Sequence, residues 1–406
     1  LNILQDLNLG FAQFISIGNQ ADVNADSAIE YWENVDDVKQ ILLYMESIAD
    51  PKRFRALASR TTKKKPIIAL KAGRSAAGAS ADALLKQSGV IREFSLQDLF
   101  NTAKVFSHCP IPNGNRVAIV TNSGGPGIMA TDAVCEHGME IAHLSDQTKE
   151  ALRSFLPAAA SVKNPVDMIA SAPLEHYKKT LETVLADDGV DMVVVIYLPF
   201  LGLKDIDVAK AVMEIRAAHP DKPIVGVFMT KNEFFAHLSE TEVNVPFFMF
   251  AEQAVEGLAR LNQQRLWRER TDTPAPRYSV DTETVEAVFK QAAADNRVQL
   301  TTGESLQVLA AYGVRVCRDG EAKDADEAVA LANKIGYPVV MKLNSKEISH
   351  KTDVGGVRVG IKDADQLRAE FADLVNKLTE KGLMDGFEGV IIQEMVKSDR
   401  EMVCGC

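Results

Sequence analysis

The sequence lacks any apolar run long enough to cross a membrane and has few cysteines. Its longest apolar run, around residues 192–203, has the length of a strand, whereas a membrane-spanning helix needs about 20 apolar residues. The five cysteines are scattered and form no C-x-x-C pair, which is typical of reduced thiols. No signal-peptide pattern opens the printed sequence. We therefore expect a cytoplasmic protein without transmembrane helices or a disulfide scaffold.

Positive charge is also scarce. Lys and Arg number 45 against 56 Asp and Glu, which gives a formal net charge of −11. An acidic chain of this kind argues against non-specific binding to nucleic acid or to an anionic membrane, so neither is expected as a partner. The 406 residues, 46% hydrophobic and 25% charged, are typical of a globular protein with several domains.

Short apolar runs rich in β-branched residues alternate with segments of helical periodicity. Their near-continuous hydrophobicity predicts strands buried on both faces of parallel sheets, and hence an α/β fold. We expect strands at residues 14–17, 40–45, 66–70, 116–121, 191–198 and 222–229, with helices at 95–106, 127–137 and 174–185. After residue 279, helices are expected at 282–294, 304–312 and 325–335, and strands at 338–343, 357–361 and 389–393.

Clusters of proline, glycine and polar residues at 109–115 and 268–277 predict domain boundaries. Three domains result, at about 1–108, 109–272 and 273–406. The similar strand–helix rhythm of the first two suggests a repeated flavodoxin-like unit. Because the sequence starts with Leu1 rather than Met and stops within an apolar run, we expect it to be part of a longer protein.

The strongest local signal is a strand, a Ser/Gly turn and a helix start within residues 116–127. After Ser123, the glycines Gly124, Gly125 and Gly127 would let a ligand approach the backbone, and free N–H groups at a helix start attract an anion. The segment is neither a Walker A loop nor a dinucleotide fingerprint. It predicts phosphate binding, with a tight strand-to-helix turn as the alternative.

A second signal lies in the third domain. Lys342 ends an apolar strand, a costly position for a charge unless it meets an anion. His350 precedes a Gly-Gly turn, where a neutral imidazole can accept a phosphoryl group. The alternative is a surface loop histidine beside a structural turn.

Two acidic residues come directly after predicted strands. Glu394 follows a buried strand and would suit a hinge that binds a purine ring, although many strands end in glutamate. Glu46 ends a predicted parallel strand, at the edge where such sheets bind ligands, and a solvated strand end is the alternative. The other six histidines show no ligand spacing, and no metal ligand can be named.

Taken together, these segments resemble the ADP-forming acyl-CoA synthetases, relatives of succinyl-CoA synthetase. The resemblance follows nearly the whole chain in order. It comprises residues 17–23, 43–46, 71–75, 87–92, 122–127 and 164–167, then Lys342, residues 350–356, Gln393 and Glu394. It implies two flavodoxin-like, succinyl-CoA-synthetase-like domains followed by part of an ATP-grasp domain.

The resemblance also implies a reaction. Acyl-CoA, ADP and phosphate would be interconverted with a carboxylic acid, CoA and ATP through an acyl phosphate and a phosphohistidine. The partners would be a small carboxylic acid and its CoA thioester, phosphate and nucleotide, with Mg²⁺ as cofactor. A homo-oligomer is expected by analogy alone. The acid, and the choice of ADP or GDP, cannot be read from the chain.

The resemblance also implies a role for each residue that matches a family position. Glu46 matches the glutamate that steadies the phosphohistidine, and 123–127 matches one of two helix starts that hold the phosphate. His350 matches a second, relay histidine near the nucleotide. Three further positions complete the set: Lys342 would bind nucleotide phosphates, Glu394, Met395 and Val396 would form the adenine hinge, and Glu401 is an acid on the next strand.

The sequence departs from the family where the phosphohistidine loop should follow Gly73-Arg74-Ser75. Near residues 80/81 it runs straight into a helical segment. Two explanations stay open. Either a mobile loop between residues 80 and 81 is left out of the numbered sequence, which we expect, or the chain lacks this loop. The family's CoA-binding domain would precede Leu1, and the carboxylates that hold Mg²⁺ would follow the last residue.

Two other functions remain open. One is a non-catalytic, ligand-sensing synthetase-like module of a protein lysine acetyltransferase, in which the loop histidine is lost. The other is an ATP-grasp ligase for a different substrate, which would not explain the first 270 residues. The presence of Glu46, Lys342 and His350 favours the working synthetase.

Overall fold

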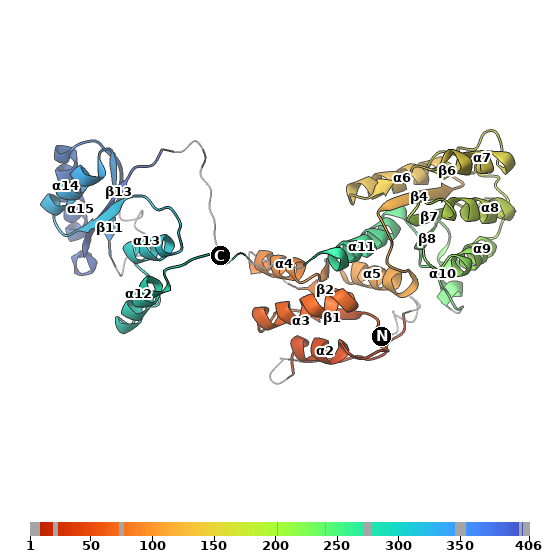
Figure 1. Ribbon diagram of the computed structural model, residues 1–406, viewed down its shortest axis with the longest axis horizontal. Helices are drawn as coiled ribbons and strands as arrows, with labels where there is room; N and C mark the ends of the chain where they lie inside the picture. Colours follow the sequence, from red (N-terminus) through yellow and green to blue (C-terminus); the bar gives the residue numbers. More distant parts are fainter. Residues whose placement is uncertain are drawn as a thin grey trace. The chain divides into compact units, whose positions relative to one another are not determined.

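The computed structural model describes residues 9–18, 23–72, 77–200, 202–239, 241–271, 276, 278–345, 355–397 and 400. The chain divides into two compact units, Leu1–Asp272 and Thr273–Cys406. Figure 1 shows helices around the sheets of each unit. In the described part of the chain, no helix is long and apolar enough to span a membrane.

The first unit opens with a three-stranded parallel sheet in the order β1-β2-β3. Its apolar side chains pack into a core with the surrounding helices. The strands are β1 (Ile41–Met45), β2 (Ile67–Lys71) and β3 (Ile91–Glu93), and the helices are α2 (Ala25–Trp32), α3 (Pro51–Lys64), α4 (Ala77–Gln87) and α5 (Leu96–His108). The predicted strands at 40–45 and 66–70 are confirmed as β1 and β2.

The predicted strand at residues 14–17 is wrong. These residues have no regular secondary structure. Phe14 is 67% exposed and Ile15 43% exposed, so the run does not bury a continuous face against a neighbouring strand. A short apolar run gives the same sequence signal whether or not it has a pairing partner.

A second parallel sheet follows, in the order β5-β4-β7-β8-β9, with β6 paired to β4. Apolar cores lie on both faces, and every residue of β7 is buried, which confirms the predicted two-sided burial. The strands are β4 (Arg116–Thr121), β5 (Glu140–Ile141), β6 (Val166–Asp167), β7 (Met192–Tyr197), β8 (Ile224–Phe228) and β9 (Phe247–Phe248). The helices are α6 (Gly124–Glu136), α7 (Asp146–Phe155), α8 (Leu174–Leu185), α9 (Asp205–Ala218), α10 (Asn232–Ser239) and α11 (Ala251–Glu269).

The long helix α11 joins the two sheets of the first unit. Arg260 on α11 donates from Nε to the Glu93 carboxylate of β3 at 2.9 Å. Glu93 is buried, and burial raises the pKa of its carboxyl group despite the arginine. Near the helix end, Trp267 donates from Nε1 to the Thr62 hydroxyl of α3 at 2.8 Å. These contacts tie helix α11 to the first sheet.

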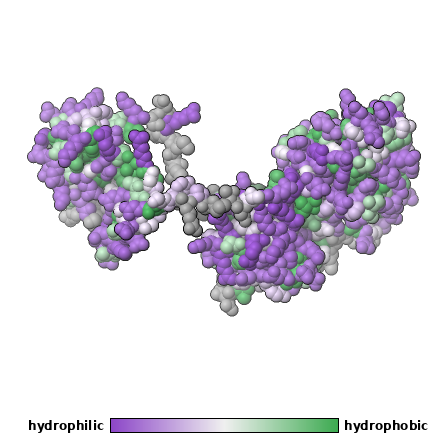
Figure 2. Space-filling model, in the orientation of Figure 1, coloured by the Kyte–Doolittle hydropathy of each residue, from purple (hydrophilic) through white to green (hydrophobic). Residues whose placement is uncertain are grey.

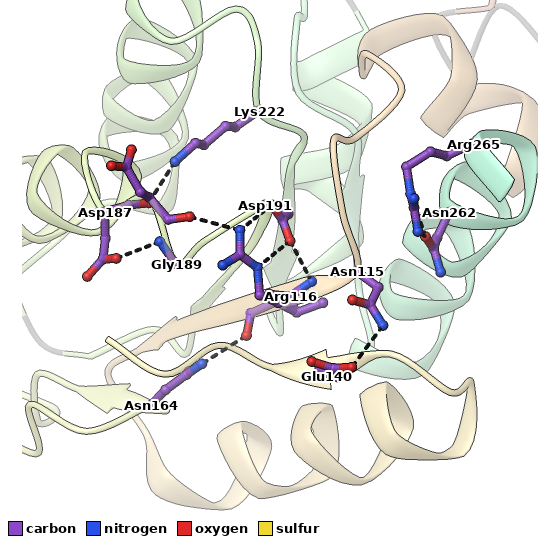
Figure 3. Close-up of polar contacts among 12 residues, drawn as sticks. Asn115, Arg116, Glu140, Asn164, Asp187, Gly189, Asp191, Lys222, Asn262 and Arg265 are labelled. Carbon is purple, nitrogen blue, oxygen red and sulfur yellow. Dashed lines mark hydrogen bonds and ion pairs between the residues drawn. The ribbon is translucent and has the colours of Figure 1, made fainter. Parts of the chain in front are cut away.

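A polar network secures the start of β4 at the edge away from its carboxyl end (Figure 3). Arg116 donates from Nε to Asp191 at 2.8 Å and from Nη2 to the Asp188 carbonyl at 2.8 Å. Lys222 donates to the Asp187 carbonyl at 2.8 Å, beside Gly189. The network therefore lies at the opposite end of the strands from their carboxyl edge, which is where a parallel sheet is expected to bind a ligand.

The second unit contains a four-stranded antiparallel sheet in the order β10-β13-β11-β12, with an apolar core. The strands are β10 (Asp319–Ala322), β11 (Val339–Asn344), β12 (Val357–Ile361) and β13 (Gly389–Glu394), and the helices are α12 (Thr282–Ala294), α13 (Thr302–Ala311), α14 (Ala325–Ile335), α15 (Ala364–Glu380) and the 3₁₀ turn η1 (Met384–Gly386). All six elements predicted after residue 279 are present.

An acid-sensitive contact between α2 and α3 gives a testable prediction. Glu33 is buried and accepts hydrogen bonds from Arg60 (2.6 Å) and Lys64 (2.8 Å), and these bonds lower its pKa to about 2. The free energy of unfolding should therefore fall as the pH drops from about 5 to about 2, since an unfolded glutamate protonates near 4.3.

The variant Glu33→Gln should lose this part of the pH dependence, measured by urea denaturation between pH 6 and pH 2.5. Glu30→Gln is the matched control, because Glu30 pairs with Arg53 on the exposed surface of the same two helices. Equal pH profiles for Glu33→Gln and the wild type would contradict the assignment.

Candidate functional site

The predicted phosphate loop lies at the carboxyl end of β4, where the strand turns into α6. Ser123 is the N-cap residue of α6, but its side chain makes no capping hydrogen bond. Its own N–H is held by the Thr121 hydroxyl at 3.0 Å, and Gly127 donates to its carbonyl at 3.4 Å. The first turn of α6 therefore keeps the anion-attracting N–H groups and dipole of an uncapped helix start.

Glycine suits each of these positions in the loop for a different physical reason. A Cβ on Gly127 would lie 3.2 Å from Thr121 Cγ2 and 3.6 Å from Pro165, so glycine lets α6 pack against β4 and the turn before β6. A Cβ on Gly124 would lie 3.3 Å from Asp167 Oδ2. Gly125 is exposed, with nothing within 4 Å of its Cβ position, so this side of the helix start is open to a ligand.

Asn122, the residue before Ser123, anchors the loop to the neighbouring strand. It is buried, donates from Nδ2 to the Leu198 carbonyl at 2.8 Å, and accepts from the Leu198 N–H at 2.9 Å. This pair of bonds ties the carboxyl ends of β4 and β7 together. The sequence motif 122–127 included Asn122, but nothing in the sequence indicated its partner.

We predict that Asn122→Ala lowers the free energy of unfolding by about 1–2 kcal/mol, because the partly buried N–H and carbonyl of Leu198 lose their partner. It should also weaken phosphate binding about tenfold or more, since the loop loses its anchor. Urea denaturation and calorimetric titration with phosphate measure the two effects. Asn115→Ala is the control, because Asn115 bonds Glu140 at the opposite end of β4. A variant with unchanged phosphate affinity would contradict the anchoring role.

The segment 164–167 places a carboxylate beside this loop. The Asn164 side chain bonds Val117 and Ile119 of β4 and the Ala142 carbonyl, at 2.8–2.9 Å. Asp167 then ends β6, next to the end of β4, and Met168 donates to the Thr121 carbonyl at 2.8 Å. The structure thus brings Asp167 to the helix start of the predicted phosphate loop.

Glu46 stands where it was predicted, directly after β1 at the carboxyl edge of the first sheet. Its side chain is exposed. Ala72 donates to the Met45 carbonyl at 2.9 Å, which fixes the strand exit. Among the described residues, no hydrogen bond or ion pair joins Glu46 to the 123–127 loop, so their pairing in one site stays a prediction.

Residues 80 and 81 are consecutive in α4, where the sequence departs from the family. The chain has no histidine before His108. Within this sequence, therefore, no histidine near residues 73–81 can take the place of the missing loop residue. The predicted relay residue His350, like Glu401, lies outside the described residues.

In the second unit, Lys342 occupies the central strand β11 between β13 and β12. It is half-buried, and it shares a strand face with Val340 and Asn344, opposite the buried Met341 and Leu343. The predicted turn before β12 is present, with Gly355 at φ +66°. Lys342 therefore lies on the face of the sheet that the apolar core leaves open.

The predicted adenine hinge is only partly available for a ligand. Glu394 accepts from Arg318 Nε and Nη2, both at 3.1 Å, and these bonds lower the pKa of its carboxyl group. Its N–H donates to the Arg318 carbonyl at 2.8 Å. Met395 is half-buried and Val396 is 68% exposed. Among the described residues, the backbone groups after Glu394 are thus the ones left to bind a purine.

No cluster of His, Cys, Asp or Glu suited to a metal ion occurs among the described residues. The surface seen in Figure 2 is mostly hydrophilic with small hydrophobic areas. On α6, Ile128 is 64% and Met129 50% exposed, directly after the predicted phosphate loop.

Known families account for most of the chain. Residues 1–106 match the succinyl-CoA ligase like flavodoxin domain, residues 117–255 the ligase-CoA domain, and residues 291–406 an ATP-grasp domain. The 4-hydroxybutyrate–CoA ligase (ADP-forming) of Nitrosopumilus maritimus is 30% identical, over 98% of this chain and 59% of the relative. The acetate–CoA ligase (ADP-forming) of Methanocaldococcus jannaschii is 30% identical, over 100% and 61%.

Solved structures with a similar fold are found as well. A protein of Pyrococcus horikoshii OT3 superposes with a TM-score of 0.60 at 38% identity, covering 65% of this chain and 60% of its own. An acetyl-coenzyme A synthetase of Ca. Korarchaeum cryptofilum, solved with phosphate and ADP, gives 0.61 at 26%, covering 66% and 61%.

The three domain types, in this order, define a CoA-ligase scaffold with an ATP-grasp portion. The chain contains the succinyl-CoA ligase like, ligase-CoA and ATP-grasp domains and is similar along nearly its whole length to ADP-forming acyl-CoA ligases, which confirms the resemblance and the predicted fold class. It spans about 59% of the length of the first of these relatives. No acetyltransferase occurs among the relatives named above, so they lend no support to that alternative.

Proposed function

We propose that the protein is an ADP-forming acyl-CoA ligase, an acid–thiol ligase that interconverts acyl-CoA, ADP and phosphate with an acid, CoA and ATP. The observation that carries the proposal is the ordered match of the two ligase domains and the ATP-grasp domain along one chain. The uncapped start of α6 at an open loop supports a phosphate site in the second of them. The three domains would be 1–108, 109–272 and 273–406.

The nucleotide would bind to the second unit. There the Lys342 ammonium would neutralise phosphate oxygens, and Met395 and Val396 would offer backbone groups to the purine, with Glu394 ordering the turn through Arg318. Bound Mg²⁺ would neutralise the charge that develops on the transferred phosphoryl group. No described residue is assigned to Mg²⁺ or to CoA.

Phosphoryl transfer between nucleotide and acyl group would require histidine in this family. His350 is the candidate relay histidine in this chain, near the nucleotide. Glu46 matches the residue that steadies the phosphohistidine of the family's loop, and this sequence does not contain that loop. The absence of histidine before His108 favours a second candidate function, a synthetase-like module that binds nucleotide and acyl-CoA without turnover. The two differ in whether ATP is made.

The acid is left open because the named relatives act on different acids, 4-hydroxybutyrate and acetate among them, while another is a trans-feruloyl-CoA synthase. We propose a small carboxylic acid by analogy with the first two. A homo-oligomer in the cytoplasm is proposed on the same basis.

The proposal is tested by ATP formation. The protein is incubated with ADP, phosphate, Mg²⁺ and each of a panel of acyl-CoA thioesters, and ATP and free CoA are measured together. Equal amounts of the two products with at least one thioester support the ligase. Binding of ADP and acyl-CoA with no ATP from any thioester would replace it with the binding module.

A further inference from the structure

The carboxylate of Asp167 lies at the start of α6, where the proposed function places phosphate. Its Oδ2 is 3.3 Å from the Cβ position of Gly124, the first residue of the helix. Its Oδ1 accepts from the Ile169 N–H at 3.0 Å, which fixes the direction of the side chain. Asp167 is also held by main-chain bonds of β6, since its N–H donates to the Ser161 carbonyl at 3.1 Å.

A carboxylate beside an anion site has a definite chemical consequence. A fully ionised anion at the helix start would be repelled by Asp167 at short range. An anion that keeps a proton can instead donate a hydrogen bond to that carboxylate, a charge-assisted bond that is among the stronger ones. At neutral pH inorganic phosphate keeps at least one proton, whereas sulfate, of the same shape, has none.

We propose that Asp167 is the residue that makes this site specific for protonated phosphate and excludes sulfate and other fully ionised tetrahedral anions. The inference rests on the proposed function, because it takes the 123–127 loop as the phosphate site. The helix start supplies attraction for any anion, and Asp167 supplies the discrimination. Neither task requires Asp167 to react.

The test compares phosphate and sulfate binding by calorimetric titration, at pH 7 and constant ionic strength. We expect the wild type to prefer phosphate over sulfate by about 100-fold, and Asp167→Asn by less than about fivefold, chiefly through tighter sulfate binding. Asparagine keeps the Oδ1 acceptor for Ile169, so the turn is preserved. Asp132→Asn is the control, because it removes the same charge from an exposed position further along α6 and should keep the wild-type preference.

The outcomes separate the two proposals. If the wild type binds neither anion, the phosphate site of the proposed function fails. If it binds phosphate selectively and Asp167→Asn keeps that selectivity, the phosphate site stands and the role of Asp167 is overturned. A thermal unfolding curve for each variant, measured without anions, shows whether a lost affinity reflects a lost fold.

Discussion

Replacing Gly89 with alanine should lower the free energy of unfolding by about 2–4 kcal/mol, through overpacking and backbone strain together. A Cβ at this position would lie 2.1 Å from Cε2 of Trp267 and 2.2 Å from Nε1. Glycine is also required by the backbone, since φ is +70° directly after α4. The indole cannot give way without cost, because Nε1 bonds Thr62 and the ring lies 5.0 Å below the Lys63 ammonium.

Gly138→Ala separates the two causes. Gly138 also has φ +70°, but nothing lies within 4 Å of its Cβ position, so only the backbone term of about 1 kcal/mol applies. Urea denaturation of both variants measures the difference. Equal losses for the two would contradict the packing of Trp267 on Gly89, and with it the attachment of the α11 end to the first sheet.

Replacing Lys342 with methionine should weaken binding of ADP and ATP about 100-fold, because the ammonium group proposed to neutralise the phosphate oxygens is removed. Methionine keeps most of the length and apolar surface of the side chain, so the sheet should remain intact. Calorimetric titration of the variant with ADP and Mg²⁺ measures the loss.

Lys334→Met is the matched control, since Lys334 is exposed in the last turn of α14 in the same unit. It should leave nucleotide affinity within about twofold, as expected for an exposed charge. A small and similar effect of both variants would remove Lys342 from the nucleotide site.

The elements that the sequence predicted well are those with strong and unbroken patterns. The helices α8, α12 and α14 and the strands β4 and β12 have the predicted bounds. The strand β10 was missed because its residues, Asp319–Ala322, are mostly polar or small, and its place is set by antiparallel pairing with β13. Pairing of this kind depends on distant residues, which local patterns do not contain.

The same limit applies to the candidate site. The motif at 122–127 located the loop that begins α6. The approach of Asp167 to Gly124, like the bonds of Asn122 to Leu198, depends on which strands are neighbours in the sheet. The motif 164–167 drew attention to Asp167 without indicating what it faces. Likewise, Glu394 was predicted at the hinge, whereas its ion pair with Arg318 follows from the β10–β13 register.

The central claim is that this chain catalyses phosphoryl transfer between nucleotide and acyl group. The most direct measurement is labelling of the protein with γ-labelled ATP and Mg²⁺, followed by CoA and a panel of small acids, for the wild type, His350→Ala and Glu46→Gln. The account predicts an acid-labile label on the wild type that is discharged with formation of acyl-CoA. It predicts no label on His350→Ala and impaired discharge for Glu46→Gln. A wild type that binds ATP but takes up no label would contradict it and indicate a binding module.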